Sequence, residues 1–228
     1  STVGILGGTG SGKSTLMYLL DRLYPLSPEN GRIEIGGVDI ADISSDWLRR
    51  NIGMVLQEPF LFSRTLEENI AIASGQEPED GKDGEHSRLA RVRSAARIAR
   101  LDETITHFAK GYDTFVGERG VTLSGGQKQR TAIAQMLIRK PPIMVFDDSL
   151  SAVDAETDAE IRKALRENVG SATVILIAHR LTTLMHADQI LVMDQGRIVQ
   201  RGTHEELLAQ DGIYRQIYDL QVRQSGSR

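Results

Sequence analysis

A glycine-rich stretch near the start of the chain constrains the fold more than any other feature of the sequence. Residues Gly7–Ser14 have the sequence GGTGSGKS, which matches the pattern GxxxxGK[ST]. The apolar run TVGIL before it is typical of a buried strand, and the apolar residues of KSTLMYLLDRLY after it have helical spacing. A strand, a glycine turn and a helix in this order predict an α/β fold with a mostly parallel sheet flanked by helices.

The residue types in this stretch favour phosphate binding. Glycines let backbone N–H groups converge on phosphate oxygens, and the following helix N-terminus adds partial positive charge. Lys13 is expected to reach the β- and γ-phosphates of a nucleotide, and the Ser14 hydroxyl to bind magnesium. A glycine turn without a ligand is the alternative interpretation. The residues predicted to bind the nucleotide are Gly7, Gly8, Thr9, Gly10, Ser11, Gly12, Lys13, Ser14 and Thr15.

Two adjacent carboxylates, Asp147 and Asp148, follow the apolar run IMVF. An aspartate at the end of a strand is common and means little alone. Together with a phosphate loop, it supplies the carboxylate that holds magnesium in nucleoside triphosphatases. We therefore expect Asp147 to be a magnesium ligand and the chain to contain a P-loop NTPase core.

Composition narrows the possible functions. The chain has 31 acidic and 27 basic residues among its 228, and the formal net charge of −4 weighs against nucleic acid as a partner. The absence of cysteine excludes disulfides and thiolate metal sites. The sequence contains no apolar run near the ~18 residues of a membrane span. Because barely one strand precedes the phosphate loop, we expect the chain to be part of a longer polypeptide.

A further segment, Leu123–Arg130, has the sequence LSGGQKQR and is the most specific stretch in the chain. The order of motifs is the phosphate loop, LQEP with Gln57, this signature segment, FDDSLSAVD, and IAHR with His179. In this order they resemble the nucleotide-binding domain of an ABC transporter, over essentially the whole chain. The resemblance implies one such domain over residues 1–228, lacking the N-terminal strands of the family. It implies an ATP-binding core at 1–60 and 140–228 and a helical subdomain at about 61–139.

The resemblance also implies ATP and Mg²⁺ as cofactors and a site shared by two domains that face head to tail. The signature residues Ser124, Gly125, Gly126 and Gln127 would then cap the γ-phosphate held by the partner domain. Gln57 would join magnesium and the attacking water to the transmembrane portion, and His179 would contact the γ-phosphate. Without the family pattern, Gln57 is a loop hydrogen-bonder and His179 a strand-end histidine.

Other segments refine this resemblance. Residues Ser151–Asp154 would cross the dimer interface, although Asp154 could instead cap the next helix. The segments VGERG, Val116–Gly120, and LRRNIGMVLQEPFLFSRTLEENI are similar to the exporter branch. Exporter membership implies transmembrane domains on the same full-length polypeptide and a place on the cytoplasmic face of a plasma or inner membrane.

The second carboxylate departs from the family pattern, which has Glu where this chain has Asp148. Asp is shorter by one methylene, roughly 1.5 Å, and a misplacement of ~1 Å can cost on the order of a hundredfold in rate. We therefore predict tight ATP binding and slow hydrolysis at this chain's own site. Since the signature is intact, the chain resembles the degenerate-site half of a heterodimeric exporter, with a non-identical partner chain.

Two alternatives remain open at this stage. In the first, a symmetric homodimeric exporter uses Asp148 as a slow base in two identical sites. In the second, a soluble ABC-type ATPase acts on nucleic acid or the ribosome. Against this second alternative are the acidic composition and the absence of a long coiled-coil insertion before the signature segment.

Overall fold

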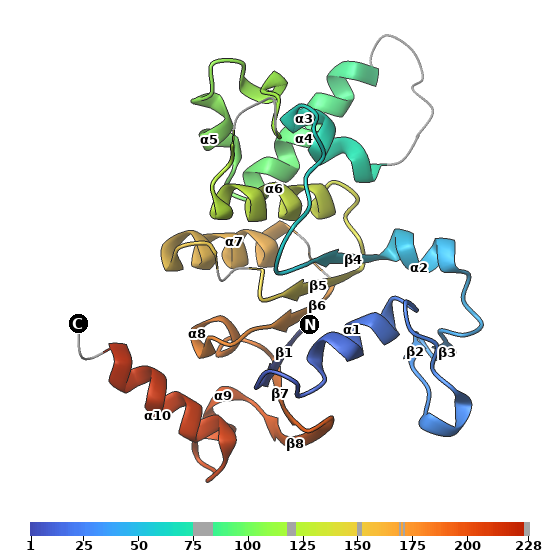
Figure 1. Cartoon of the computed structure of the whole chain (residues 1–228), viewed down its shortest axis with the longest axis vertical. Coiled ribbons are helices and arrows are strands. Elements are labelled where there is room, and N and C mark those ends of the chain that lie inside the picture. The colour runs from blue at the N-terminus through green and yellow to red at the C-terminus, as the bar shows by residue number, and fades with distance from the viewer. Residues whose placement is uncertain (75–83, 118–121, 150–151, 169, 171, 226–228) are drawn as a thin grey trace. The chain divides into compact units, whose positions relative to one another are not determined.

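The computed structural model describes residues 1–74, 84–117, 122–149, 152–168, 170 and 172–225. The chain forms two compact units (Figure 1). Unit 1 contains Ser1–Gly53, Pro142–Asp148 and Ala172–Arg228, and unit 2 contains Met54–Pro141 and Ser149–Ser171. The division predicted from sequence, with a helical subdomain at about 61–139, stays a prediction, since unit 2 also includes a second segment beyond that range.

Unit 1 contains most of a sheet whose strand order is β4-β5-β6-β1-β7-β8; the last two residues of β4 belong to unit 2. Strand β1 pairs in parallel with both β6 and β7, β5 pairs in parallel with β6, and β7 and β8 form an antiparallel hairpin. This mostly parallel sheet confirms the predicted fold class. The strands are β1 (Thr2–Gly7), β4 (Ile52–Val55), β5 (Ile143–Asp147), β6 (Thr173–Ile177), β7 (Gln189–Asp194) and β8 (Arg197–Gly202).

The central strands of this sheet are buried, as apolar parallel strands usually are. Met144, Val145 and Phe146 of β5 are almost fully buried, and so are Ile190 and Val192 of β7. Helix α8 packs on β1, and α9 and α10 lie beside β8 (Figure 1). The helices of unit 1 are α1 (Lys13–Leu20), α2 (Ser45–Asn51), α8 (Leu181–Leu184), α9 (His204–Leu208) and α10 (Ile213–Ser225); a short hairpin joins β2 (Glu34–Ile35) to β3 (Val38–Asp39).

Unit 2 is helical among its described residues. Helices α3, α4 and α6 pack on one another around Leu66, Ile70, Val92 and Ile133, all of which are fully buried. Its helices are α3 (Leu66–Ala71), α4 (Gly84–Ile98), α5 (Asp102–Thr106), α6 (Gly125–Leu137) and α7 (Ala155–Asn168). Across the described parts of both units, every helix is too short or too polar to cross a bilayer.

Candidate nucleotide-binding site

The phosphate loop joins the end of β1 to the start of α1, as the sequence predicts. A side chain at Gly7 would clash with Ser11 Oγ, and its Cβ would lie 2.6 Å from the carbonyl oxygen of Met193. Only glycine fits there. The loop closes on itself through a hydrogen bond from the Ser11 N–H to the Gly8 carbonyl (3.2 Å), and the Gly196 N–H donates to the Ser11 carbonyl (3.0 Å). The turn between β7 and β8 therefore supports the loop.

Lys13 is buried at the centre of this loop. Its Nζ donates to the carbonyl oxygens of Gly7 and Gly8, both at 2.8 Å, and to Ser11 Oγ at 3.3 Å. Burial lowers the pKa of Lys13, and the nearby carboxylates of Asp147 and Asp148 oppose this shift. The ammonium group is thus held among loop carbonyls, close to the end of β5.

The N-terminus of α1 is suited to an anion. Its N-cap residue is Gly12, which provides no side-chain cap. The first N–H groups of a helix have no partner within the helix, and the helix dipole makes this end partially positive. Ser14 and Thr15 lie exposed in the first turn. Backbone donors, a lysine and a hydroxyl therefore lie at one helix end, the set that phosphate binding requires.

Asp147 is the last residue of β5, and Asp148 follows it. Burial and the charge of Asp148 raise the pKa of Asp147, whereas Lys13 and His179 lower it. These four side chains come from three separate segments of the chain and influence one another electrostatically. The structure of unit 1 thus brings together the predicted phosphate loop, both carboxylates and the predicted histidine.

The backbone of Asp148 is unusual for a non-glycine residue. Its φ is 43°, in the left-handed region, and its N–H donates to the carbonyl of Ile177 at the end of β6 (2.7 Å). Asp and Asn adopt this region more readily than longer side chains, because their short polar groups bond locally. The local backbone therefore suits Asp148 better than the Glu that the resemblance predicts at this position.

The signature segment begins α6 in unit 2. Ser124 is the N-cap: its Oγ accepts a hydrogen bond from the Gln127 N–H (3.2 Å), and Gln127 Oε1 accepts one from the Ser124 N–H (2.9 Å). This reciprocal pair is a capping box. A Cβ at Gly126 would lie 3.1 Å from the carbonyl oxygen of Ala152, so the helix start packs tightly against the segment before α7.

Gln57 lies in unit 2 with its side chain exposed. Its backbone is held by a residue that sequence reasoning did not select. Gln129 of α6 is almost fully buried, and its Nε2 donates to the carbonyls of Gln57 (2.9 Å) and Leu56 (3.3 Å). Gln129 belongs to the signature segment, which the sequence analysis singled out. Nothing in that segment, however, indicates that its side chain bonds the backbone at Gln57.

Asp154 caps α7, since its Oδ1 accepts a hydrogen bond from the Thr157 N–H at 2.9 Å. This bond lowers the pKa of the exposed Asp154 carboxyl. The helix-capping interpretation therefore holds, while a role at a dimer interface stays a prediction. Ser151 and residues 118–120 of the predicted exporter segment lie outside the described residues.

A protein-family model described as "ABC transporter" matches residues 1–151 of this chain. The chain belongs to the ABC transporter family. The chain is similar to the uncharacterized ABC transporter ATP-binding protein YfiB of Bacillus subtilis. The two are 46% identical over a match that covers 99% of this chain and 37% of YfiB. Leukotoxin translocation ATP-binding protein LktB of Mannheimia haemolytica is 44% identical over 96% of the chain and 30% of its own length.

A solved structure is also similar to this ABC transporter chain. The structure of a bacterial Atm1-family ABC exporter with ATP bound is 42% identical, with a TM-score of 0.87 over 97% of this chain and 37% of the exporter chain. The chain therefore spans about a third of the length of the relatives it matches. These comparisons confirm the resemblance to ABC exporters. The roles of Gln57, His179 and the signature residues stay predictions.

Proposed function

We propose that this chain is the ATP-hydrolysing motor domain of an ABC exporter. Two such domains close head to tail on ATP and drive export of a substrate across a membrane, from its cytoplasmic face. The observation that carries the proposal is the phosphate loop, where Lys13 donates to two loop carbonyls at the uncapped N-terminus of α1. In the same sheet, strand pairing sets Asp147 in register with Ile177, two residues before His179. The site combines phosphate-binding donors with the carboxylates of Asp147 and Asp148, which could hold magnesium and orient water, as phosphoryl transfer requires; the contact of His179 with the γ-phosphate is part of the proposal.

The donor set fits ATP with magnesium. Lys13 and the α1 backbone are donors for phosphate oxygens, and the hydroxyl of Ser14 and the carboxylate of Asp147 are oxygen ligands. Magnesium usually takes one or two protein carboxylates together with substrate phosphates and water. Bound magnesium would neutralise charge on the phosphates. Gln57 belongs to unit 2, and its place as a third magnesium ligand is part of the proposal.

The partner domain would use the signature of this chain. Ser124 and the first N–H groups of α6 would cap the γ-phosphate on the partner's phosphate loop. Asp148 would leave this chain's own site slow, because its carboxylate is one methylene short of the reach of Glu. The assembly would then be an asymmetric pair with a non-identical partner chain, in which this chain completes the faster site.

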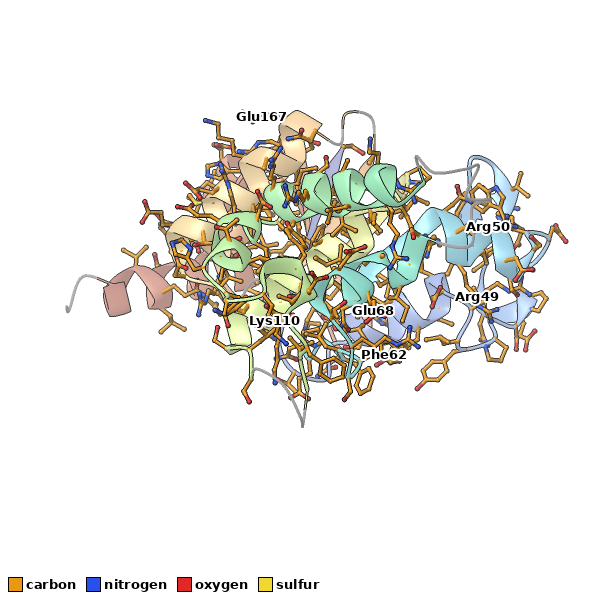
Figure 2. The ribbon with its side chains drawn as sticks, turned by 90° about the horizontal axis from the view of Figure 1, so that it is seen from above. Arg49, Arg50, Phe62, Glu68, Lys110 and Glu167 are labelled. Atoms are coloured by element: carbon orange, nitrogen blue, oxygen red, sulfur yellow. The ribbon has the colours of Figure 1, made fainter. Side chains whose placement is uncertain are left out.

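An exposed aromatic surface in unit 2 supports contact with transmembrane domains. Phe60 is 73% exposed and its ring lies 5.0 Å from that of Phe62, in an edge-to-face arrangement. Figure 2 shows Phe62 at the surface near α3, where its N–H donates to Asn69 Oδ1 at 2.8 Å. Phe115 is 42% exposed on the neighbouring segment, which bridges to Thr65. We take the exposed Phe60–Phe62 pair as one candidate contact for the transmembrane domains.

Single-turnover ATP hydrolysis by the full-length assembly tests both the activity and its asymmetry. Asp148→Glu should raise hydrolysis at this chain's own site by about a hundredfold, the usual cost of a ~1 Å misplacement. Ser124→Ala should abolish most of the existing hydrolysis, which occurs at the partner's site. Asp42→Glu, an exposed acid lengthened in the same way, is the matched control.

The left-handed backbone at position 148 adds a cost for Glu on the order of 1 kcal/mol, so thermal stability is measured alongside. Equal turnover at both wild-type sites would show that Asp148 is a competent base and would favour a symmetric dimer. No hydrolysis in wild type or in Asp148→Glu would contradict the proposed function.

A further inference from the structure

We propose that Gln221, on the C-terminal helix α10, is a positioning residue that orients His179. Gln221 Nε2 donates to the backbone carbonyl of His179 at 2.8 Å, and Gln221 Oε1 accepts from the N–H of Leu181 at 3.0 Å. The inference rests on the proposed role of His179 at the γ-phosphate and adds the element that holds it. It makes α10 part of the nucleotide site, although it lies 42 residues further along the chain.

The two hydrogen bonds define the orientation of the amide. One carboxamide side chain spans a carbonyl and an N–H that are two residues apart. Only one assignment of its oxygen and nitrogen satisfies both, because a flipped amide would face a donor with a donor and an acceptor with an acceptor. The backbone on both sides of Arg180 is therefore fixed by a single side chain.

The segment held in this way needs support from elsewhere. His179 lies between the end of β6 and α8, which has only four residues. Arg180 occupies the N-cap position of α8 and provides no side-chain cap. The N–H of Leu181 is one of the first N–H groups of α8 and has no partner within that helix. Gln221 supplies the acceptor, so it acts as a helix cap from another element.

Helix α10 is itself firmly anchored. Tyr214 near its start is fully buried; its N–H donates to Gln200 Oε1 of β8 at 3.0 Å, and its hydroxyl is 2.7 Å from His204 Nδ1 of α9. Gln221 is seven residues after Tyr214, and residues at this spacing share one helix face. Figure 1 shows α10 beside α9, and α10 also contacts α8. Helix α10 thus connects the buried Tyr214 to the backbone of His179 and Leu181.

Loss of Gln221 should affect recognition of the γ-phosphate and little else at the nucleotide site. Asp147 at the end of β5 pairs in register with Ile177 of β6, and the Asp148 N–H donates to the Ile177 carbonyl at 2.7 Å. His179 follows Ile177 by two residues, so the backbone that carries it lies beside the predicted phosphate site. A small rotation of the 179–181 backbone would move that ring, while the phosphate loop would be unaffected. Loss of Gln221 should therefore weaken the preference for ATP over ADP and leave binding of the shared part of the nucleotide nearly unchanged.

Photo-cross-linking with radiolabelled 8-azido-ATP tests this in the full-length assembly, because the label identifies the chain that binds it. Competition with unlabelled ATP and ADP gives the ATP preference of this chain's own site without requiring turnover. Removing a hydrogen bond to a charged group costs about tenfold or more, so His179→Ala should lose about tenfold of that preference. Gln221→Leu should lose a large part of the same preference.

The matched control is Gln216→Leu, an exposed glutamine on the same helix, which should behave as wild type. The double variant Gln221→Leu with His179→Ala should match His179→Ala within about twofold, because the two residues act through one contact. Hydrogen exchange should increase in residues 179–184 of Gln221→Leu and stay unchanged in the phosphate loop. A purely structural role would instead lower the affinities for ATP and ADP alike.

The experiment distinguishes a failure of the role proposed for His179 from a failure of the inference about Gln221. Unchanged ATP preference in His179→Ala would disprove the role proposed for His179, and the inference with it. Lost preference in His179→Ala together with wild-type preference in Gln221→Leu would disprove the inference alone. Losses that add independently in the double variant would also overturn it. Gln221→Glu, which keeps the acceptor for Leu181 and loses the donor for His179, should behave like Gln221→Leu and guards against a packing defect.

Discussion

Helices α1 and α6 both begin with glycine-rich turns, yet they satisfy their first N–H groups in different ways. Helix α1 follows Gly12, which offers no cap, and carries Lys13 at its first position. Helix α6 follows Ser124, which forms a capping box with Gln127. No side chain therefore caps the start of α1, whereas at α6 the N-cap side chain accepts from the third helical N–H and leaves the first two for another acceptor.

This difference explains how one chain could contribute to two nucleotide sites, its own through the start of α1 and the partner's through the start of α6. A hydroxyl can accept a hydrogen bond and still donate its own proton. Ser124 can therefore keep its bond from the Gln127 N–H and offer its O–H to a phosphate oxygen. The α6 end would bind a phosphate that arrives already held by a partner, and the α1 end would bind one from solution.

Loss of Lys13 should have the largest effect, because the α1 end has no other buried cation among the described residues. Lys13→Ala should weaken ATP binding at this chain's site by about a hundredfold, since hydrogen bonds to charged groups are worth up to about 3 kcal/mol. Photo-cross-linking of this chain with azido-ATP measures it. Lys163→Ala, an exposed lysine on α7, is the control. Binding within a few-fold of wild type would mean that α1 does not hold the phosphates.

Ser124→Asp separates capping from phosphate binding at α6. Asp is as good an N-cap as Ser, and its charge suits a helix N-terminus, so the apparent Tm should stay unchanged or rise slightly. The same charge repels phosphate, so single-turnover hydrolysis at the partner's site should fall more than about tenfold. Ser44→Asp makes the same exchange at the N-cap of α2 and should leave hydrolysis unchanged. Wild-type hydrolysis in Ser124→Asp would break the comparison between the two helices.

Local features were predictable from the sequence, and contacts between distant segments were not. The phosphate loop and the strand ending in Asp147 are each formed by residues adjacent in the chain. The patterns GGTGSGKS and IMVFDD were therefore enough to predict them. The bonds from Gln129 to the Gln57 carbonyl and from Gln221 to His179 join residues 72 and 42 positions apart. A side chain that bonds a remote backbone leaves no periodicity in the sequence. The left-handed backbone of Asp148 likewise has no signal beyond the residue type.

The two helix ends should also differ in their effect on the free energy of unfolding. The α1 end lies beside Asp147, whose pKa is raised from the ordinary 3.8 by burial and by the charge of Asp148. A carboxyl whose pKa is higher in the folded state binds its proton more tightly when folded. The free energy of unfolding therefore falls as pH rises from 3.8 through that raised pKa, and at neutral pH the nucleotide-free protein carries this cost in full.

Asp147→Asn should remove that cost while losing the magnesium ligand, and it is the smallest effect expected here. At pH 7 the apparent Tm of the nucleotide-free protein should rise slightly, because the ionised Asp147 carboxylate, whose pKa is raised by burial and by the charge of Asp148, opposes folding. The gain should shrink as pH falls below the raised pKa, because wild type then becomes protonated and resembles the amide. Asp42→Asn controls for the loss of one negative charge at an exposed site. A lower Tm for Asp147→Asn at pH 7 would mean that its carboxylate stabilises the fold, and the α1 end would then carry no stability cost that distinguishes it from the α6 end.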